Sequence, residues 1–227
     1  MANPAFYFLI SSAGGSAYNM ACDEALLQAM PRFGIPVLRF YGWTEPAASF
    51  GYFQRIAEVE RLTLLCPLVR RPTGGGIVPH DNDWTYSLTF PTSHDWYSFA
   101  AIESYRETHD WIRRAFMSLG VGCELAAESR RAAAGQCFLG HEKFDLLYRG
   151  QKIAGAAQRR TRDGLLIQGS VQSPLPEMER GVWETAMLSE RGEPTDWREL
   201  KPDEKLTTAV EQLARKKYSQ GSYNRKR

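Results

Sequence analysis

Three strand-like segments separated by short turns, between residues 143 and 168, constrain the fold of this chain most strongly. Residues 143–148 and 151–155 have the pattern of two strands, and only Arg149 and Gly150 lie between them. Asp163 and Gly164 then introduce a third strand at 165–168. A two-residue turn joins antiparallel neighbours, whereas parallel strands need a long crossover connection. The segment therefore predicts a β-meander and argues against a doubly wound βαβ repeat.

Further strands are expected before the meander. Short apolar runs predict a buried strand at Phe6–Ile10, a strand at Val37–Tyr41 and another near residues 68–71. At residues 85–90, apolar side chains alternate strictly with Thr85, Ser87 and Thr89, which predicts a half-buried strand.

Three helices are expected to flank these strands. The first spans residues 16–30 and is ended by Pro31, and the second spans 98–119, lies across the sheet and is capped by Gly120. The third spans 202–218 with Pro202 in its first turn. The fold class is therefore α+β, a mixed or antiparallel sheet flanked by helices, in a single domain over residues 1–227 without a separate C-terminal accessory domain.

The composition is that of an ordinary globular protein. The 227 residues are 43% hydrophobic and carry a net charge of +2, so they provide no basic field of the kind that binds nucleic acid. No signal peptide is recognisable at the N-terminus, and no apolar run reaches about 18 residues. We therefore expect a cytoplasmic protein with neither a nucleic-acid nor a membrane partner, whose four cysteines are reduced thiols.

A glycine-rich segment at residues 70–81, Arg-Arg-Pro-Thr-Gly-Gly-Gly-Ile-Val-Pro-His-Asp, is the first candidate for a binding site. Successive glycines let a backbone approach a ligand closely and expose its N–H groups, while Arg70, Arg71 and His80 add polar donors. The segment has neither the Walker nor the dinucleotide-binding glycine pattern. An acyl chain or an adenylate would suit it; the alternative interpretation is a tight turn.

Cys137 and Lys152, fifteen residues apart, are the second candidate. If the intervening hairpin folds back, the lysine ammonium favours the thiolate and makes the cysteine nucleophilic near neutral pH. The small residues that follow Lys152 leave room for a ligand beside a strand. Two alternatives stay open: both residues serve packing and solvation only, or Cys137 pairs with His141 as a cysteine hydrolase.

Taken together, these segments resemble the biotin/lipoate protein ligase superfamily, most closely its cysteine-dependent octanoyltransferases of the LipM type. The resemblance extends over nearly the whole chain and keeps the family's order. It rests on residues 19–27, 38–43, 51–54, 70–76, 80–81, 85–87, 137–138, 152–158 and 217–218.

The resemblance implies an acyl-enzyme mechanism. Cys137 stands at the position of the thioester-forming nucleophile, and Lys152 at the position that lowers the pKa of that thiol and holds the acyl carbonyl. The substrate-binding positions of the family correspond to Arg71, Thr73, Gly74, Gly75, Gly76, His80, Gly155, Ala156 and Ala157. The implied donor is an octanoyl-acyl carrier protein, and the implied acceptor is a lysine of a lipoyl-type protein such as the glycine cleavage H protein.

No cofactor and no metal are expected for this reaction, because a thioester needs no activation by ATP. The alternative within the same superfamily is a lipoate-protein ligase, which would use ATP and Mg²⁺ to form an adenylate. An alternative of another class is a non-catalytic module that binds acyl groups or a carrier protein. The basic residues at 215–217 and 225–227 either meet an acidic carrier protein or form a solvated helix end.

Overall fold

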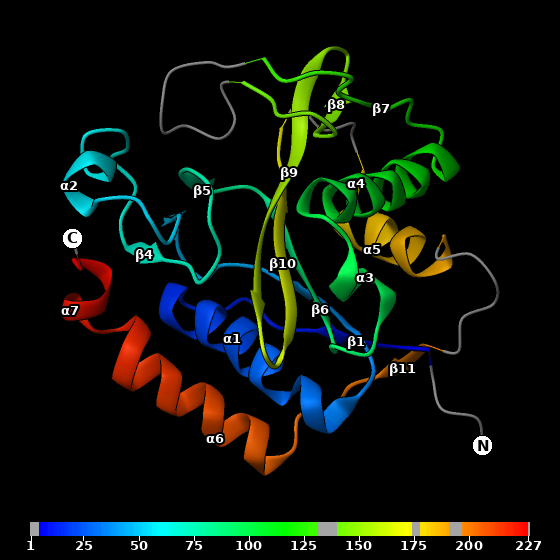
Figure 1. Cartoon of the computed structure of the whole chain (residues 1–227). Coiled ribbons are helices and arrows are strands. Elements are labelled where there is room, and N and C mark those ends of the chain that lie inside the picture. Colours follow the sequence, from blue (N-terminus) through cyan, green and yellow to red (C-terminus); the bar gives the residue numbers. More distant parts are fainter. Residues whose placement is uncertain (1–4, 131–139, 174–177, 191–196, 227) are drawn as a thin grey trace.

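Two sheets and two helical layers make up the protein (Figure 1). The computed structural model describes residues 5–130, 140–173, 178–190 and 197–226. Cys137, the expected nucleophile, lies outside the described residues.

The larger sheet is mixed and has the strand order β11-β1-β2-β6-β10-β9-β8-β7. Strand β1 runs parallel to both β11 and β2, and the other neighbours are antiparallel. The bounds are β1 Phe6–Ile10, β2 Val37–Tyr41, β6 Trp84–Phe90, β7 Glu124–Leu125, β8 Leu146–Tyr148, β9 Gln151–Thr161, β10 Gly164–Val171 and β11 Trp197–Glu199. The predicted meander is confirmed as β8-β9-β10, although β8 begins at Leu146 and not at residue 143.

A smaller sheet of three strands presents the glycine-rich segment. Strand β3, Ala47–Phe50, is parallel to β4, Leu68–Arg70, and antiparallel to β5, Val78–His80. The short helix α2, Ile56–Val59, connects β3 to β4. The glycine loop occupies the connection between β4 and β5, so its two ends are held by hydrogen-bonded strands.

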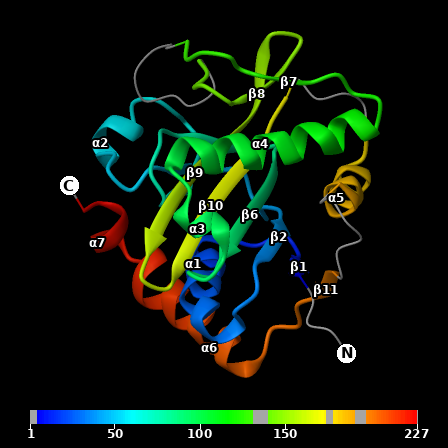
Figure 2. The same ribbon diagram turned by 45° about the vertical axis from the view of Figure 1, so that its right-hand side comes forward.

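Helices cover both faces of the larger sheet (Figure 2). Helices α3, Asp95–Ser98, α4, Ala101–Ser118, and α5, Arg180–Ser189, lie on one side. On the other side α1, Ser16–Phe33, packs against α6, Glu204–Leu213, which continues through a π-helical turn at Ala214–Tyr218 to α7, Gly221–Asn224. None of the helices within the described ranges has the length and apolarity to cross a membrane.

The structure contradicts two of the predicted helix ends and confirms a third. Pro31 does not end α1, which continues to Phe33 and stops where Gly34, at φ 65°, donates its N–H to the Met30 carbonyl. The last helix begins at Glu204, because Asp203 caps it by accepting the Leu206 N–H, so Pro202 precedes the first turn. The predicted cap at Gly120 is confirmed: its φ is 78° and its N–H bonds to the Met117 carbonyl.

Strand β6 corrects the prediction of a half-buried strand. Tyr86, Leu88 and Phe90 enter the core under α4 and α5, as the alternation indicates. The opposite face, with Thr85, Ser87 and Thr89, is buried as well. It is covered by α1, and the Ser87 hydroxyl donates to the Asp23 carboxylate of that helix at 2.7 Å. The polar residues of β6 therefore face a buried polar layer and not solvent. Likewise β1, expected to be buried, is mostly half-buried.

The centre of this layer is an ion pair between Asp23 on α1 and Arg39 on β2. Arg39 Nη1 lies 2.7 Å from Asp23 Oδ1, and both side chains are 0% exposed. Asp23 also accepts hydrogen bonds from Tyr41, Ser87 and Gln168 at 2.7–2.9 Å. Burial and the neighbouring carboxylate raise the pKa of Tyr41, so its hydroxyl remains a donor. A buried charge is tolerated only when it is paired and hydrogen-bonded, and here both conditions are met.

We expect Asp23→Asn to lower the free energy of unfolding by about 3–5 kcal/mol, because it leaves the buried Arg39 charge without its counter-ion. Urea unfolding followed by circular dichroism measures this loss. The matched control is Asp110→Asn, which breaks partly exposed ion pairs on α4 and should cost no more than about 1 kcal/mol. Equal losses in the two variants would contradict a central role for the pair.

Candidate functional site

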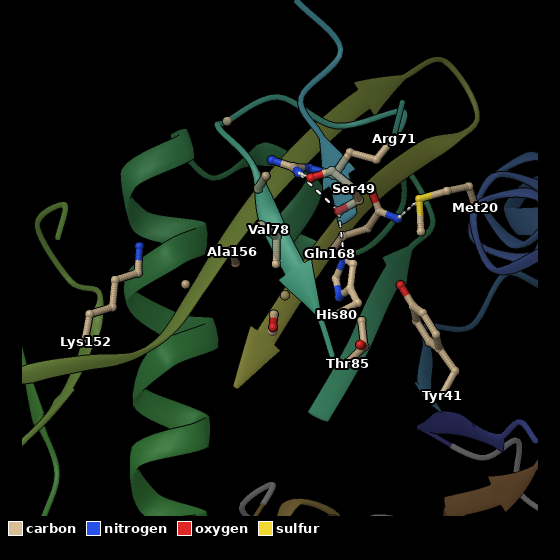
Figure 3. A pocket seen from close by; sticks show the side chains of 15 residues that line it. Met20, Tyr41, Ser49, Arg71, Val78, His80, Thr85, Lys152, Ala156 and Gln168 are labelled. Atoms are coloured by element: carbon tan, nitrogen blue, oxygen red, sulfur yellow. Dashed lines mark hydrogen bonds between the residues drawn. The ribbon is translucent and has the colours of Figure 1, made fainter. Parts of the chain in front are cut away.

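A pocket opens between the smaller sheet and the β9-β10 hairpin of the larger one (Figure 3). Its lining residues come from both sheets and from α1. They are Met20, Tyr41, Ser49, Arg71, Gly75, Val78, His80, Thr85, Lys152, Gly155, Ala156, Ala157, Gln168, Gly169 and Ser170. Most of the residues proposed from the sequence as a site are thus brought together, although 72 positions separate His80 from Lys152.

The predicted site residues fall into three groups. Seven line the pocket: Arg71, Gly75, His80, Lys152, Gly155, Ala156 and Ala157. Thr73, Gly74 and Gly76 stand behind the lining and shape the loop that carries Gly75. Cys137 belongs to the segment that the structure leaves undescribed, so its position relative to Lys152 stays a prediction.

Arg71 braces the glycine loop from within. Its guanidinium donates to the carbonyls of Gly74, Gly76 and Ser49, and Nη1 also reaches Ser49 Oγ at 3.3 Å. These five hydrogen bonds equal the number of N–H groups in a guanidinium. Arg70 is bound in the same way, with five bonds to backbone carbonyls of residues 52, 54, 223, 224 and 226. Arg71 therefore holds the backbone of the glycine loop, whereas Arg70 joins the segment between β3 and α2 to the C-terminal residues 223–226.

Close packing of backbone fixes the loop further. A Cβ placed on Gly51 would lie 1.9 Å from the Gly75 carbonyl oxygen, so only glycine fits at that position. Gly75 itself has φ 87°, in the region that favours glycine. Thr73 donates to Gln168 Oε1 at 2.7 Å, and Gln168 Nε2 donates to Asp23. The loop is thereby connected to the buried polar layer under α1.

Lys152 reaches the opposite side of the pocket from His80 (Figure 3). Its ammonium lies 2.7 Å from Asp145 Oδ2, and each side chain is only 8% exposed. A Cβ on Gly155 would lie 2.8 Å from Lys152 Nζ and 2.7 Å from Cε. The glycine expected to line the site therefore has a second function, because it leaves the space that the lysine side chain occupies.

The Asp145 carboxylate is positioned by an unusual turn. Phe144 has φ 72°, and its carbonyl accepts a hydrogen bond from His109 Nδ1 on α4 at 2.6 Å. Since a carbonyl can only accept, Nδ1 carries the proton. Burial lowers the pKa of His109, so the ring is neutral. Asp145 also accepts the Glu142 N–H at 2.7 Å. The lysine is therefore paired with a carboxylate that other residues hold in place.

His80 is fixed on both of its nitrogens. Nδ1 lies 2.9 Å from Asp83 Oδ2, and Nε2 lies 2.8 Å from Ser49 Oγ. The ring stacks on Trp43 with 3.8 Å between the centroids. Burial alone would raise the pKa of Asp83, but His80 and hydrogen bonds from Ser170 and Thr85 outweigh it and lower the pKa. Asp83 is therefore an ionised acceptor beneath the pocket.

The C-terminal basic residues are partly engaged in packing. Lys217 pairs with Glu24 of α1 at 2.6 Å, and Arg225 pairs with Glu60 at 3.2 Å. The neighbouring Tyr218 is buried and donates to the same Glu24 carboxylate. Arg215 and Lys216 are exposed. Part of the cluster thus holds the C-terminal helices against α1 and the smaller sheet.

Comparisons with known proteins agree with this architecture. Residues 16–174 match the family model of the lipoyl protein ligase A/B catalytic domain, and the chain belongs to this family. It is 37% identical over 172 residues to an octanoyltransferase LipM of Carboxydothermus hydrogenoformans. That match covers 72% of this chain and 63% of the relative, so the chain spans less than two thirds of the relative's length.

Solved structures share the fold at low sequence identity. A crystal structure of lipoate-protein ligase A bound with ATP has a TM-score of 0.78 and 21% identity, over 99% of both chains. A bi-partite lipoate protein ligase from Thermoplasma acidophilum, described with its E2 lipoyl domain, has a TM-score of 0.75 and 19% identity, over 98% of this chain and 97% of that one. The predicted family and the α+β fold class are confirmed.

Several residues of the site were not predicted from the sequence. Asp145, Asp83 and Ser49 were not predicted, and Trp43 was noted only within the resembling segment 38–43 and not as a site residue. Asp83 comes three residues after His80, which is a weak signal, because carboxylates near a histidine are common on loops. Ser49 carries no signal at all, since its contact with His80 depends on the pairing of β3 with β5.

We expect Gly155→Ala to destabilise the protein by about 1–3 kcal/mol, because the added methyl group overlaps the lysine side chain. Urea unfolding measures the loss. Gly122→Ala, at an exposed glycine with open space around it, is the control and should change stability by less than about 0.5 kcal/mol. In a Lys152→Ala background, which removes both Cε and Nζ, the cost at Gly155 should shrink; an unchanged cost would show that the overlap does not involve the lysine side chain.

Proposed function

We propose that this chain transfers an octanoyl group to a lysine side chain of a lipoyl-type acceptor protein, in protein lipoylation. The observation that carries the proposal is the buried Lys152 on the wall of a pocket whose neighbouring residues, Gly155, Ala156 and Ala157, are small. The identity with a relative named octanoyltransferase supports it.

The chemistry follows from the acyl group and the two proposed catalytic residues. The Cys137 thiolate attacks the carbonyl carbon of an acyl thioester, and the donor thiol leaves with a proton. The amine of the acceptor lysine then attacks the Cys137 thioester, the C–S bond breaks, and an amide forms. A cationic Lys152 beside the thiol stabilises the thiolate by charge attraction. A thioester is already activated, so the scheme uses no ATP.

Partners follow from the same scheme. The proposed donor is an octanoyl-acyl carrier protein, and the proposed acceptor is a lipoyl domain or the glycine cleavage H protein. The Thermoplasma acidophilum ligase belongs to a lipoylation system that includes an E2 lipoyl domain, which supports an acceptor of this kind. The exposed Arg215 and Lys216 add positive charge that suits an acidic carrier protein.

The ligase alternative requires a site for ATP and Mg²⁺. Within the described ranges, no three His, Cys, Asp or Glu side chains come together to hold a metal ion. Arg70 and Arg71, which a phosphate group would attract, donate hydrogen bonds to backbone carbonyls, and Arg71 also donates to the Ser49 hydroxyl. We derive no step through a nucleotide, and the ligase stays the alternative that the ATP requirement of the reaction tests.

We expect intact-protein mass spectrometry to detect an octanoyl adduct after incubation with octanoyl-acyl carrier protein without ATP. The adduct should be labile to hydroxylamine, as a thioester is. Cys137→Ala should remove it, whereas Cys123→Ala, which changes a half-buried thiol elsewhere, should retain it. An ATP-dependent modification of a lipoyl domain from free acid in both variants would contradict the transferase and support the ligase. If neither the thioester adduct nor the ATP-dependent modification is detected, the result would support a non-catalytic binding module.

We also expect Lys152→Ala to raise the pKa of the Cys137 thiol, because it removes the positive charge that stabilises the thiolate. The rate of alkylation of Cys137 by iodoacetamide at pH 7, followed by peptide mapping, should fall about tenfold, and its pH profile should move to higher pH. Lys216→Ala, at an exposed lysine, is the control. An unchanged pH profile in Lys152→Ala would contradict the proposal that Lys152 stabilises the Cys137 thiolate.

A further inference from the structure

Ser49, His80 and Asp83 form a linear chain of hydrogen bonds inside the pocket. Ser49 Oγ lies 2.8 Å from His80 Nε2, and His80 Nδ1 lies 2.9 Å from Asp83 Oδ2. Ser49 and His80 both line the pocket, and Figure 3 shows the contact between them. The connectivity is that of a hydroxyl nucleophile, an imidazole base and a carboxylate that orients the base.

The contacts at the two ends of this hydrogen-bond chain are compatible with one tautomer of His80. Arg71 Nη1 is 3.3 Å from Ser49 Oγ and can only donate, so a lone pair of Ser49 faces the arginine. The hydroxyl proton of Ser49 is then directed to His80 Nε2. At the other end the ionised Asp83 can only accept, which places a proton on His80 Nδ1. In the tautomer that is protonated on Nδ1 alone, Nε2 accepts the Ser49 proton, as a general base requires.

The arrangement is held rigidly. Ser49 pairs with Val78, and Ala47 pairs with His80, so Ser49 and His80 are diagonal neighbours on adjacent antiparallel strands. Trp43 stacks on the imidazole, and its indole N–H donates to Thr85 at 2.7 Å. Thr85 and Ser170 in turn donate to Asp83 at 2.8 and 2.6 Å. Each member of the chain thus has neighbours that fix its orientation.

We propose that Ser49, activated by His80 and Asp83, is a second acyl-accepting nucleophile that gives this protein a serine-type hydrolase activity on medium-chain acyl esters and thioesters. The same pocket carries Lys152 and the small residues of β9, so an acyl chain bound there lies in a cavity that also contains the serine. The activity is separate from transfer through Cys137.

The proposed reaction has two steps. Ser49 Oγ attacks the acyl carbonyl carbon while its proton passes to His80 Nε2, and the carbonyl oxygen carries the negative charge that develops. The bond to the leaving alcohol or thiol breaks, and His80 returns the proton to that group. Water, deprotonated by His80, then attacks the Ser49 ester, which releases the carboxylic acid and restores the hydroxyl and the neutral imidazole.

An alkyl fluorophosphonate, which reacts with activated serines, tests the proposal on the intact protein. The phosphonate should be found on Ser49 by peptide mapping of the wild type, a result that does not depend on the folding of any variant. Asp83→Asn should slow the labelling by at least about 100-fold, because the base loses its orienting carboxylate. Ser189→Ala, at a serine on α5, is the matched control and should label normally.

Hydrolysis gives an independent readout. In a Cys137→Ala background, p-nitrophenyl octanoate should still be hydrolysed, and adding Ser49→Ala should reduce that rate at least about tenfold. Absence of the phosphonate from Ser49 in the folded wild type would overturn the proposal, as would equal labelling of Asp83→Asn. Neither outcome depends on thioester formation at Cys137, so the two proposals fail separately.

Discussion

The buried ion pair between Arg39 and Asp23 is the interaction on which the rest of the structure depends. It joins β2 to α1 in the interior, and the carboxylate also gathers donors from Ser87 on β6 and Gln168 on β10. The helix is therefore held on the sheet by directional bonds as well as by apolar contacts. Directional bonds in a low-dielectric interior define one register and one orientation, which apolar packing alone does less strictly.

The same interaction reaches the pocket through one further residue. Gln168 bonds to Asp23 with its amide nitrogen and to Thr73 with its amide oxygen, so the glycine loop is tied to the layer beneath α1. At the pocket, the charged groups have partners nearby. Lys152 forms an ion pair with Asp145, and Arg71 donates hydrogen bonds to backbone carbonyls. A wall built in this way suits a ligand whose bound part is uncharged, such as an acyl chain.

Local patterns in the sequence predicted the helices and strands, but not which side chains contact one another. The short turns at Arg149-Gly150 and after Thr161 defined the meander, and the spacing of apolar residues defined α4, because both signals lie within a few residues. Thr85, Ser87 and Thr89 were misread as a solvent face, since the carboxylate that binds Ser87 is 64 positions away. Ser49 and Asp145 were not predicted for another reason: the contact of Ser49 with His80 depends on strand register, and Asp145 follows the left-handed Phe144. The Cys137–Lys152 contact stays a prediction from the expected hairpin and from the family resemblance, because Cys137 lies outside the described residues.

The five backbone carbonyls that bind Arg70 affect the order in which the protein can fold during its synthesis. Three of its five carbonyl partners belong to residues 223, 224 and 226, more than 150 positions downstream. During synthesis, chains emerge from the N-terminus and fold in that order. The buried donors of the Arg70 guanidinium are therefore satisfied only after residues 223–226 have been synthesised and have docked. The larger sheet and α1 can assemble earlier, whereas the hydrogen bonds that hold Arg70 beside the glycine loop are complete only when α7 docks.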